Sequence, residues 1–221
     1  MEVSSAAPFR ELTVAAFVER LASAEPVPGG GSASAVAAAI AAGLVAMVAS
    51  LSIGRPRYVD HEAVLIATKD EATGLADRCL ALADDDADAY AGYAAAMKLP
   101  RERPEEQEVR RVALQAAARA ASLVPLSALE ACRDIVAAAE RLAGRSNINA
   151  ASDLAVASLL AEAAARGAGA NVLVNLPATG DEGFAAELGE RVDILLAETG
   201  RLAEETRAAV AAGVPRPPLP A

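Results

Sequence analysis

Aromatic side chains are scarce in this chain of 221 residues: they make up 3% of it, and tryptophan is absent. The hydrophobic fraction is nevertheless 54%, and much of it is alanine, which is the best helix former and a poor strand former. The composition therefore argues against a β-sandwich, a barrel or a disordered chain. It favours closely packed helices, in which many small contacts and a partner subunit replace bulky anchors.

Cysteine and histidine are also rare, with two cysteines and one histidine. Cys79 and Cys132 do not suggest a disulfide framework, and no CxxC or Cys/His cluster points to zinc. His61 cannot form a histidine metal site alone and is interpreted as a surface or helix-start residue. We expect no metal and no bound cofactor.

Basic residues are outnumbered, since 20 Lys and Arg face 30 Asp and Glu and give a net charge of −10. An acidic surface repels phosphate, so non-specific nucleic-acid binding is excluded, and an anionic substrate would need locally clustered basic residues. The N-terminus has an early acid and lacks the apolar stretch of a signal peptide. The expected location is the cytoplasm.

One segment suggests a membrane location instead, because no residue from Pro26 to Gly54 is charged. Its length alone would admit a membrane span. It is mostly Ala, Gly and Ser, however, so transfer to lipid would gain little. A buried central helix is favoured over a membrane helix, with a membrane-anchored protein that needs detergent kept as an alternative.

Apolar spacing and turn signals predict an all-α, up-and-down bundle of long helices. Thr13 is a candidate N-cap of the first helix, Ser32 of the second, and Pro125 either kinks a helix or begins a new one. Residues 1–214 are expected to form one domain and 215–221 a loose, proline-rich tail. The expected helices span residues 14–22, 33–51, 60–97, 104–124, 125–143, 152–166 with a continuation through 171–176, and 181–212.

The loop from Pro28 to Ser32 is the first candidate site, because three consecutive glycines let the backbone approach a ligand closely at a helix start. It is not a phosphate-binding P-loop, since the GK[ST] ending and a preceding strand are missing. A flexible turn capped by Ser32 explains it equally well.

An acidic run, four aspartates within residues 84–88, is the second candidate. Successive helical residues point about 100° apart, so the four cannot all face water equally. Asp86 shares the apolar stripe of Leu82 and Tyr93, and an inward carboxylate is a candidate general base or cation stabiliser. The alternative is a solvated acidic face.

Basic and amide side chains supply the third and fourth candidates. If helices fold back, a group of cations could meet an anionic tail, although solubilising loop charges are as plausible. Asn171 and Asn175 share a helical face and could bind a heterocycle or brace a neighbouring loop. Tyr58 and Tyr90 could pack at a pocket mouth. The cations are Arg55, Arg57, Lys98, Arg101 and Arg103, and a further polar turn holds Asn147, Asn149, Ser152 and Asp153.

Taken in order, eight motifs resemble the cyclodeaminase/cyclohydrolase family, which includes the C-terminal domain of formiminotransferase-cyclodeaminase and stand-alone bacterial methenyltetrahydrofolate cyclohydrolases. The resemblance covers roughly residues 10 to 210. Two departures are Pro56, which interrupts a usual basic tract, and Ser146, which replaces a frequent glycine. The motifs are PGGGS (28–32), RPRY (55–58), DxDAxAY (84–90), MKLPR (97–101), EExExRR (105–111), VPL (124–126), NxNxxSD (147–153) and NVxVNL (171–176).

The resemblance implies an all-α homodimer with a folate site near the dimer interface. It implies a catalytic aspartate that maps best to Asp86 and second to Asp84. Lys98 and Arg55 or Arg57 would hold the folate's glutamate tail, whether it is a single glutamate or polyglutamylated. The implied substrate-binding residues are Pro28, Gly29, Gly30, Gly31, Ser32, Arg55, Arg57, Lys98, Asn149, Asp153, Asn171 and Asn175.

The implied activity is hydrolysis of 5,10-methenyltetrahydrofolate to 10-formyltetrahydrofolate, which the lack of an attached formiminotransferase domain favours. The alternative is a formimidoyltetrahydrofolate cyclodeaminase that releases ammonia. A third, non-enzymatic reading is a helical folate-binding module without catalysis. The expected reaction uses no metal, and neither nucleic acid nor a membrane is an expected partner.

Overall fold

The computed structural model describes residues 7–219, and those residues contain helices and no strand. The prediction of an all-α bundle of long helices is therefore confirmed. The α-helices are α1 (Val14–Leu21), α2 (Gly30–Ser50), α3 (Glu62–Met97), α4 (Pro104–Leu142), α5 (Ala151–Asn175) and α6 (Glu182–Ala212), and short 3₁₀ turns are η1 (Phe9–Glu11), η2 (Pro56–His61), η3 (Ile148–Ala150) and η4 (Leu176–Thr179).

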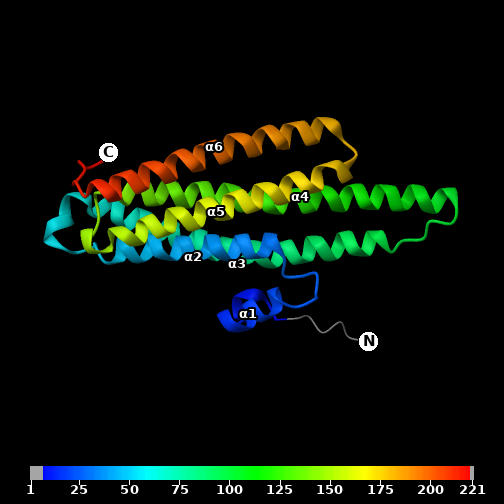
Figure 1. Ribbon diagram of the computed structural model, residues 1–221, viewed down its shortest axis with the longest axis horizontal. Helices are drawn as coiled ribbons and strands as arrows, with labels where there is room; N and C mark the ends of the chain where they lie inside the picture. The colour runs from blue at the N-terminus through cyan, green and yellow to red at the C-terminus, as the bar shows by residue number, and fades with distance from the viewer. Residues whose placement is uncertain (1–6, 220–221) are drawn as a thin grey trace.

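Successive long helices run up and down beside one another, with α2 packed between α3 and α5 (Figure 1). At 1.5 Å per residue, α3 and α4 are about 54 and 58 Å long, whereas α2 is about 32 Å. The α3–α4 pair therefore extends beyond the start of α2 as a hairpin. The N-terminal helix α1 lies outside the bundle, beside α2 and α3 (Figure 1).

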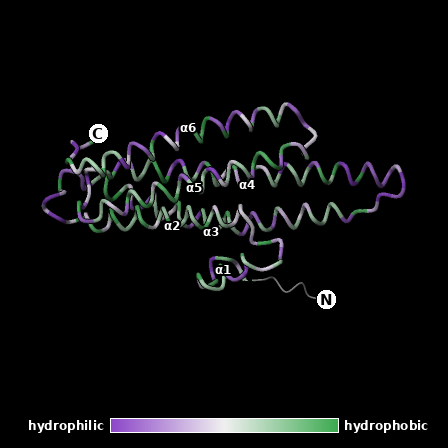
Figure 2. The backbone as a smooth tube through the Cα atoms, in the orientation of Figure 1, coloured by the Kyte–Doolittle hydropathy of each residue, from purple (hydrophilic) through white to green (hydrophobic). Residues whose placement is uncertain are grey.

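Alanine forms most of the bundle core, as the composition predicts. Ala38, Ala41 and Ala42 of α2 are completely buried, as are Ala157 and Ala161 of α5, which packs against α2. Figure 2 shows hydrophobic residues concentrated where α2 lies among its neighbours, and hydrophilic residues at the far turn of the α3–α4 hairpin. Small side chains let the helix backbones approach closely, so many weak contacts stabilise the core.

The uncharged helix α2 is central, but the interpretation that it is a fully buried helix, apolar on every face and covered on every side, is wrong. One stripe of α2 faces outward, with Ile40 53% exposed and Met47 and Leu51 each 39% exposed. The stripe arises because α2 packs against α3, α5 and, more lightly, α4, which leaves the side between α3 and α5 uncovered.

Pro125 does not begin a new helix, because α4 continues through it from Pro104 to Leu142. Proline has no N–H, so the carbonyl of Ala121 loses its helical partner. The Asn175 side chain donates to that carbonyl from α5 at 2.8 Å, which supplies the missing hydrogen bond. As expected, residues 171–175 are helical and belong to α5.

The described part of the C-terminal tail is held against the bundle, contrary to the expectation of a loose segment. Arg216 donates its backbone N–H to the Gly144 carbonyl at 2.9 Å and forms an ion pair with Glu140 at 2.6 Å. Gly144 has φ +75°, and a Cβ there would lie 2.9 Å from the Arg216 side chain. The division between a domain ending at 214 and a tail stays a prediction.

Three stretches are long and apolar enough to cross a membrane by length and composition alone: α2, α4 and Ile148–Thr179. In this structure all three pack against one another within the bundle. The expectation that the chain does not span a membrane stays a prediction.

Candidate functional site

A cavity of about 330 Å³ lies where the start of α2 meets the middle of α3, with α4 and α5 forming the other walls. It brings together three predicted features that are far apart in sequence: the glycine loop, the acidic run and the late asparagines. We call it the Asp86 pocket. It is lined by Pro26, Val27, Gly29, Gly30, Gly31, Asp86, Ala89, Tyr90, Tyr93, Ala121, Asn171, Val174 and Asn175.

Gly31 lies directly against the Asp86 carboxylate. A Cβ at Gly31 would lie 2.5 Å from Asp86 Cγ and closer still to Oδ1, so no larger residue fits without moving the carboxylate. Gly29 is the N-cap of α2 and offers no side-chain cap, and Pro28 before it is buried and joined to Val27 by a cis peptide bond. The glycines thus allow a carboxylate to sit at the start of a helix.

Asp86 is half-buried, and burial raises its pKa above the usual aspartate value. Hydrogen bonds from the Ser32 hydroxyl and backbone oppose that rise without cancelling it. The net effect is a carboxylate that binds a proton more readily than an exposed aspartate does, as a group that moves protons near neutral pH requires.

Contrary to the prediction, Ser32 does not cap α2, because the helix begins two residues earlier. The Ser32 hydroxyl contacts the pocket carboxylate instead. Ser32 Oγ lies 2.9 Å from Asp86 Oδ2 and 3.0 Å from the Ala83 carbonyl. A hydroxyl can donate to an ionised Asp86, or accept from a protonated Asp86 while donating to Ala83. Ser32 can therefore stabilise both protonation states.

Asn171 and Asn175 project from one face of α5. The amide nitrogen of Asn171 donates to Gly167, and that of Asn175 donates to Ala121 and Asn171. The bracing role considered for at least one of them is thus present. Their amide nitrogens are engaged by the backbone, so each side chain has a carbonyl oxygen left to accept a hydrogen bond from a ligand.

Tyr90 and Tyr93 line the same cavity. Tyr90 was a candidate for a pocket mouth and is 41% exposed, whereas Tyr93 was interpreted only as a core residue. The spacing could have identified both, because they lie four and seven residues after Asp86 and hence on one helical face. No such spacing identifies Ala121 as a lining residue. Its carbonyl is free to accept from another helix only because Pro125, four residues later, has no N–H.

Asp84 does not line the Asp86 pocket. Its carboxylate accepts the Phe9 backbone N–H at 2.7 Å and lies 3.9 Å from the Arg10 guanidinium. It holds the N-terminal segment against α3, which is a structural task. Asp85 and Asp88 are exposed, so the acidic run is divided between inward and outward positions as helical geometry requires.

The remaining predicted binding residues lie away from the pocket within one chain. Arg55 and Arg57 precede or begin η2, and Asn149 and Asp153 lie at the start of α5, all near the end of α2 opposite Gly31. Lys98 follows α3 at the far turn of the hairpin. Within one chain α3 is one unbroken helix that separates Arg55 and Arg57 from Lys98, so not all of these cations meet, and their role in substrate binding stays a prediction.

No group of three or more His, Cys, Asp or Glu residues that could hold a metal ion occurs within residues 7–219. The expectation of a reaction without metal or bound cofactor stays a prediction. Both cysteines are buried, and burial raises the pKa of the Cys79 thiol to about 11, so neither is suited to act as a nucleophile.

Comparison with known proteins links this geometry to one family. Residues 13–194 match the family model described as formiminotransferase-cyclodeaminase. The chain is 38% identical to methenyltetrahydrofolate cyclohydrolase of Methylorubrum extorquens, over 87% of this chain and 92% of that protein. It is 35% identical to the formimidoyltransferase-cyclodeaminase of Sus scrofa, over 82% of this chain but only 34% of that longer protein.

A solved structure has the same fold. The formiminotetrahydrofolate cyclodeaminase of Thermotoga maritima superimposes with a TM-score of 0.83 at 26% sequence identity, covering 92% of this chain and 98% of that one.

Proposed function

The chain belongs to the formiminotransferase-cyclodeaminase family, and from this premise we propose that it hydrolyses 5,10-methenyltetrahydrofolate to 10-formyltetrahydrofolate in the Asp86 pocket. Support for this reaction comes from a cyclohydrolase relative that matches the chain over nearly the full length of both proteins.

The observation that carries the proposal is the charge of the pocket. Asp86 is the one charged residue among those that line it, and the other walls are glycine, alanine, tyrosine and amide groups. The methenyl form of the folate ring is a cation, so a fixed, half-buried carboxylate both attracts it and stabilises charge near its reacting carbon.

Asp86 acts first as a general base. Water adds to the methenyl carbon between N5 and N10 while Asp86 takes one proton from it, which gives a neutral carbinol. The bond from that carbon to N5 then breaks, Asp86 returns the proton to N5, and the hydroxyl loses its remaining proton to become the formyl oxygen on N10. The net change is addition of one water and release of one proton.

The walls of the pocket orient the ring. The free carbonyl oxygens of Asn171 and Asn175 accept from ring N–H groups, and the tyrosine rings at 90 and 93 provide flat surfaces for stacking. The pterin edge is thereby fixed relative to Asp86, which is what an attack by a single water requires.

The anionic glutamate tail must leave this pocket, since no cation lines it. Lys98 is exposed twelve residues beyond Asp86, about 18 Å farther along α3. A tail that follows α3 meets Lys98 first, and a longer, polyglutamylated tail reaches the exposed Arg101.

Within one chain, the motifs around Arg55 and Asn149 lie at the opposite end of the bundle from the Asp86 pocket. A homodimer brings these two ends together. The outward stripe of α2 is apolar and uncharged, and a Cβ at Gly43 in its middle would meet no atom within 4 Å. If a second copy packs antiparallel on this stripe, the Arg55 and Asn149 end of one copy lies beside the Asp86 pocket of its partner. Such exposed apolar faces mark protein interfaces.

Ile40→Glu tests the dimer, because it places a charge in the middle of the stripe. The variant should elute and sediment as a single 22.3 kDa chain, whereas the wild type has twice that mass, and folate turnover should fall with dissociation. Asp77→Lys, an equally exposed change on α3 away from the stripe, is the control. A monomeric wild type with full activity would refute the dimer.

Cyclodeamination is the second candidate, and one observation favours it: the Thermotoga maritima cyclodeaminase is covered over 98% of its length. In that reaction N10 attacks the carbon of the protonated formimino group on N5, and Asp86 carries the N10 proton to the leaving nitrogen. The bond from the carbon to that nitrogen then breaks, so that neutral ammonia departs and the positive charge stays on the methenyl form. The same pocket and the same proton carrier serve both reactions.

Turnover of the two folates distinguishes the candidates. Purified protein should remove the characteristic absorption of 5,10-methenyltetrahydrofolate faster than buffer does. Appearance of that absorption from 5-formiminotetrahydrofolate, together with ammonia, would instead assign the cyclodeaminase reaction. Folate binding with neither reaction would identify a non-catalytic module and refute the proposal.

Ser32→Ala tests how the protein tunes Asp86. The Ser32 hydroxyl lowers the pKa of Asp86 against the effect of burial, so its removal should raise that pKa further. The acidic limb of the kcat/KM profile should therefore move to higher pH. A pH profile that stays in place would show that Asp86 is not the group that titrates, and Ser127→Ala, outside the pocket, is the control.

A further inference from the structure

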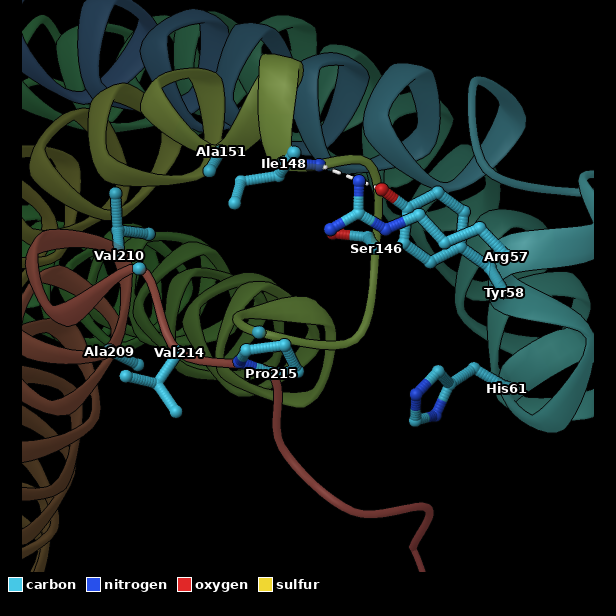
Figure 3. A pocket seen from close by; sticks show the side chains of 12 residues that line it. Arg57, Tyr58, His61, Ser146, Ile148, Ala151, Ala209, Val210, Val214 and Pro215 are labelled. Atoms are coloured by element: carbon cyan, nitrogen blue, oxygen red, sulfur yellow. Dashed lines mark hydrogen bonds between the residues drawn. The ribbon is translucent and has the colours of Figure 1, made fainter.

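A second cavity lies at the opposite end of the bundle, about 30 Å along α2 from the Asp86 pocket. Its volume is about 170 Å³, and it shares no lining residue with that pocket. Figure 3 shows Arg57, Tyr58 and His61 of η2 on one side, and Val210, Val214 and Pro215 from the end of α6 and the following segment on the other.

Three side chains of this cavity, Arg57, Tyr58 and His61, have hydrogen-bonding capacity that no described residue uses. Arg57 makes no ion pair or side-chain hydrogen bond with any residue in the described part of the chain; its guanidinium only lies 5.8 Å from the Tyr58 ring centroid. The Tyr58 hydroxyl accepts the Ile148 N–H at 3.1 Å, which leaves its own proton available. His61 Nδ1 is buried and has no partner among residues 7–219.

Two further arginines are chain neighbours of residues that line the cavity: Arg145 lies between Gly144 and Ser146, and Arg216 follows Pro215. Burial, and then the charge of Arg216, lowers the pKa of Arg145. Glu140 pairs with Arg216 at 2.6 Å, and no acidic residue lines the cavity. Arg57 is exposed, and no described acidic residue pairs with its charge, whereas the buried His61 Nδ1 lacks any partner. This arrangement suits an anion.

The remaining wall is apolar and fixed. Ile148 and Ala151 face the donors from α5 and the turn before it, opposite Val210 and Val214. The segment after α6 is held in place because Arg145 Nε donates to the Pro217 carbonyl at 2.7 Å. The cavity has about half the volume of the Asp86 pocket, which suits a short ligand rather than a whole folate.

We infer that this cavity binds a small organic anion, a carboxylate on a short aliphatic chain, with the carboxylate on Arg57, Tyr58 and His61 and the chain against Ile148 and Val214. This cavity shares no lining residue with the Asp86 pocket, and Arg57, which the resemblance assigns to the folate tail, is assigned here to a small anion instead. Guanidinium and phenol groups bind carboxylates by charge-assisted hydrogen bonds, and the apolar wall selects for an alkyl group.

Methyl NMR of the full chain tests the site, with pentanoate as the probe. Pentanoate should shift the methyl signals of Ile148, Val210 and Val214 and leave that of Val174, in the Asp86 pocket, unchanged. Pentanol, which lacks the charge, and inorganic phosphate, which lacks the alkyl chain, should each bind about tenfold more weakly.

Two variants complete the test. Arg57→Gln should weaken pentanoate binding about tenfold or more, whereas Arg78→Gln, an exposed arginine of α3 outside both cavities, should leave it unchanged. The inference is overturned if Arg57→Gln has no effect, if phosphate or pentanol binds as well as pentanoate, or if a folate displaces pentanoate from these methyl groups. None of these readouts requires folate turnover, so the result is independent of the proposed activity.

Discussion

Asp86→Asn is expected to lower kcat/KM for methenyltetrahydrofolate by roughly 10²–10⁴-fold, the usual contribution of a general acid–base group. Asparagine keeps the size of the side chain and an oxygen that can accept from the Ser32 hydroxyl, which lies 2.9 Å away in the wild type. It cannot carry a proton between water and N5. Binding of the cationic ring should also weaken, because the only charge in the pocket is removed.

The stability of this variant should not fall with its activity. Burial raises the pKa of Asp86 in the folded chain, so folding favours the protonated form, and the contribution of this group to stability is lost as pH rises through its folded pKa. At neutral pH the asparagine variant should therefore unfold at the same temperature as the wild type or higher. Activity then falls without a loss of stability, which a merely structural residue would not produce.

Asp85→Asn is the matched control, because it removes the same charge from the adjacent, exposed position on α3. Its activity should stay within about twofold of the wild type, as surface substitutions usually have small effects. If Asp86→Asn retained the activity of Asp85→Asn, Asp86 would have no part in catalysis.

Gly31→Ala should abolish most activity while leaving the fold intact. An alanine Cβ would lie 2.5 Å from Asp86 Cγ, so the carboxylate must swing away from its place beside Ser32. A displacement of about 1 Å can cost on the order of 10²-fold in rate. The backbone accepts alanine, because Gly31 is already helical, and the gain of about 1 kcal/mol in helix propensity offsets the steric cost.

Gly74→Ala is the control for Gly31→Ala, since a Cβ there meets no atom within 4 Å in α3. It should raise the unfolding temperature slightly and leave turnover unchanged. Combining Gly31→Ala with Asp86→Asn should cause little further loss, because both changes act on one carboxylate. Full additivity of the two losses would show that Gly31 acts by some other route.

Local sequence signals located the helices well, because their ends are marked by caps that act over a few residues. Thr13 accepts the Ala16 N–H at 3.1 Å, and Asp181 accepts the Phe184 N–H at 2.9 Å. The N-cap prediction was wrong at Ser32, because its hydroxyl bonds to the carboxylate of Asp86, 54 residues away in the sequence. Side-chain partners from other helices cannot be inferred from local spacing.

The site was partly predictable for a related reason. Helical geometry requires some aspartates of the acidic run to point inward, but it does not say which partner each one meets. Asp84 binds the N-terminal segment and Asp86 meets the glycine loop. Arg57 was grouped with Lys98 by charge, whereas the unbroken length of α3 holds the two at opposite ends of the molecule.

The crystal structure of the chain with 10-formyltetrahydrofolate bound tests the central claim most directly. The account predicts that the pterin lies between Tyr93 and Asn171, with the formyl carbon within reach of Asp86 directly or through one water. A folate bound elsewhere, with the Asp86 carboxylate out of contact with it, would contradict the account.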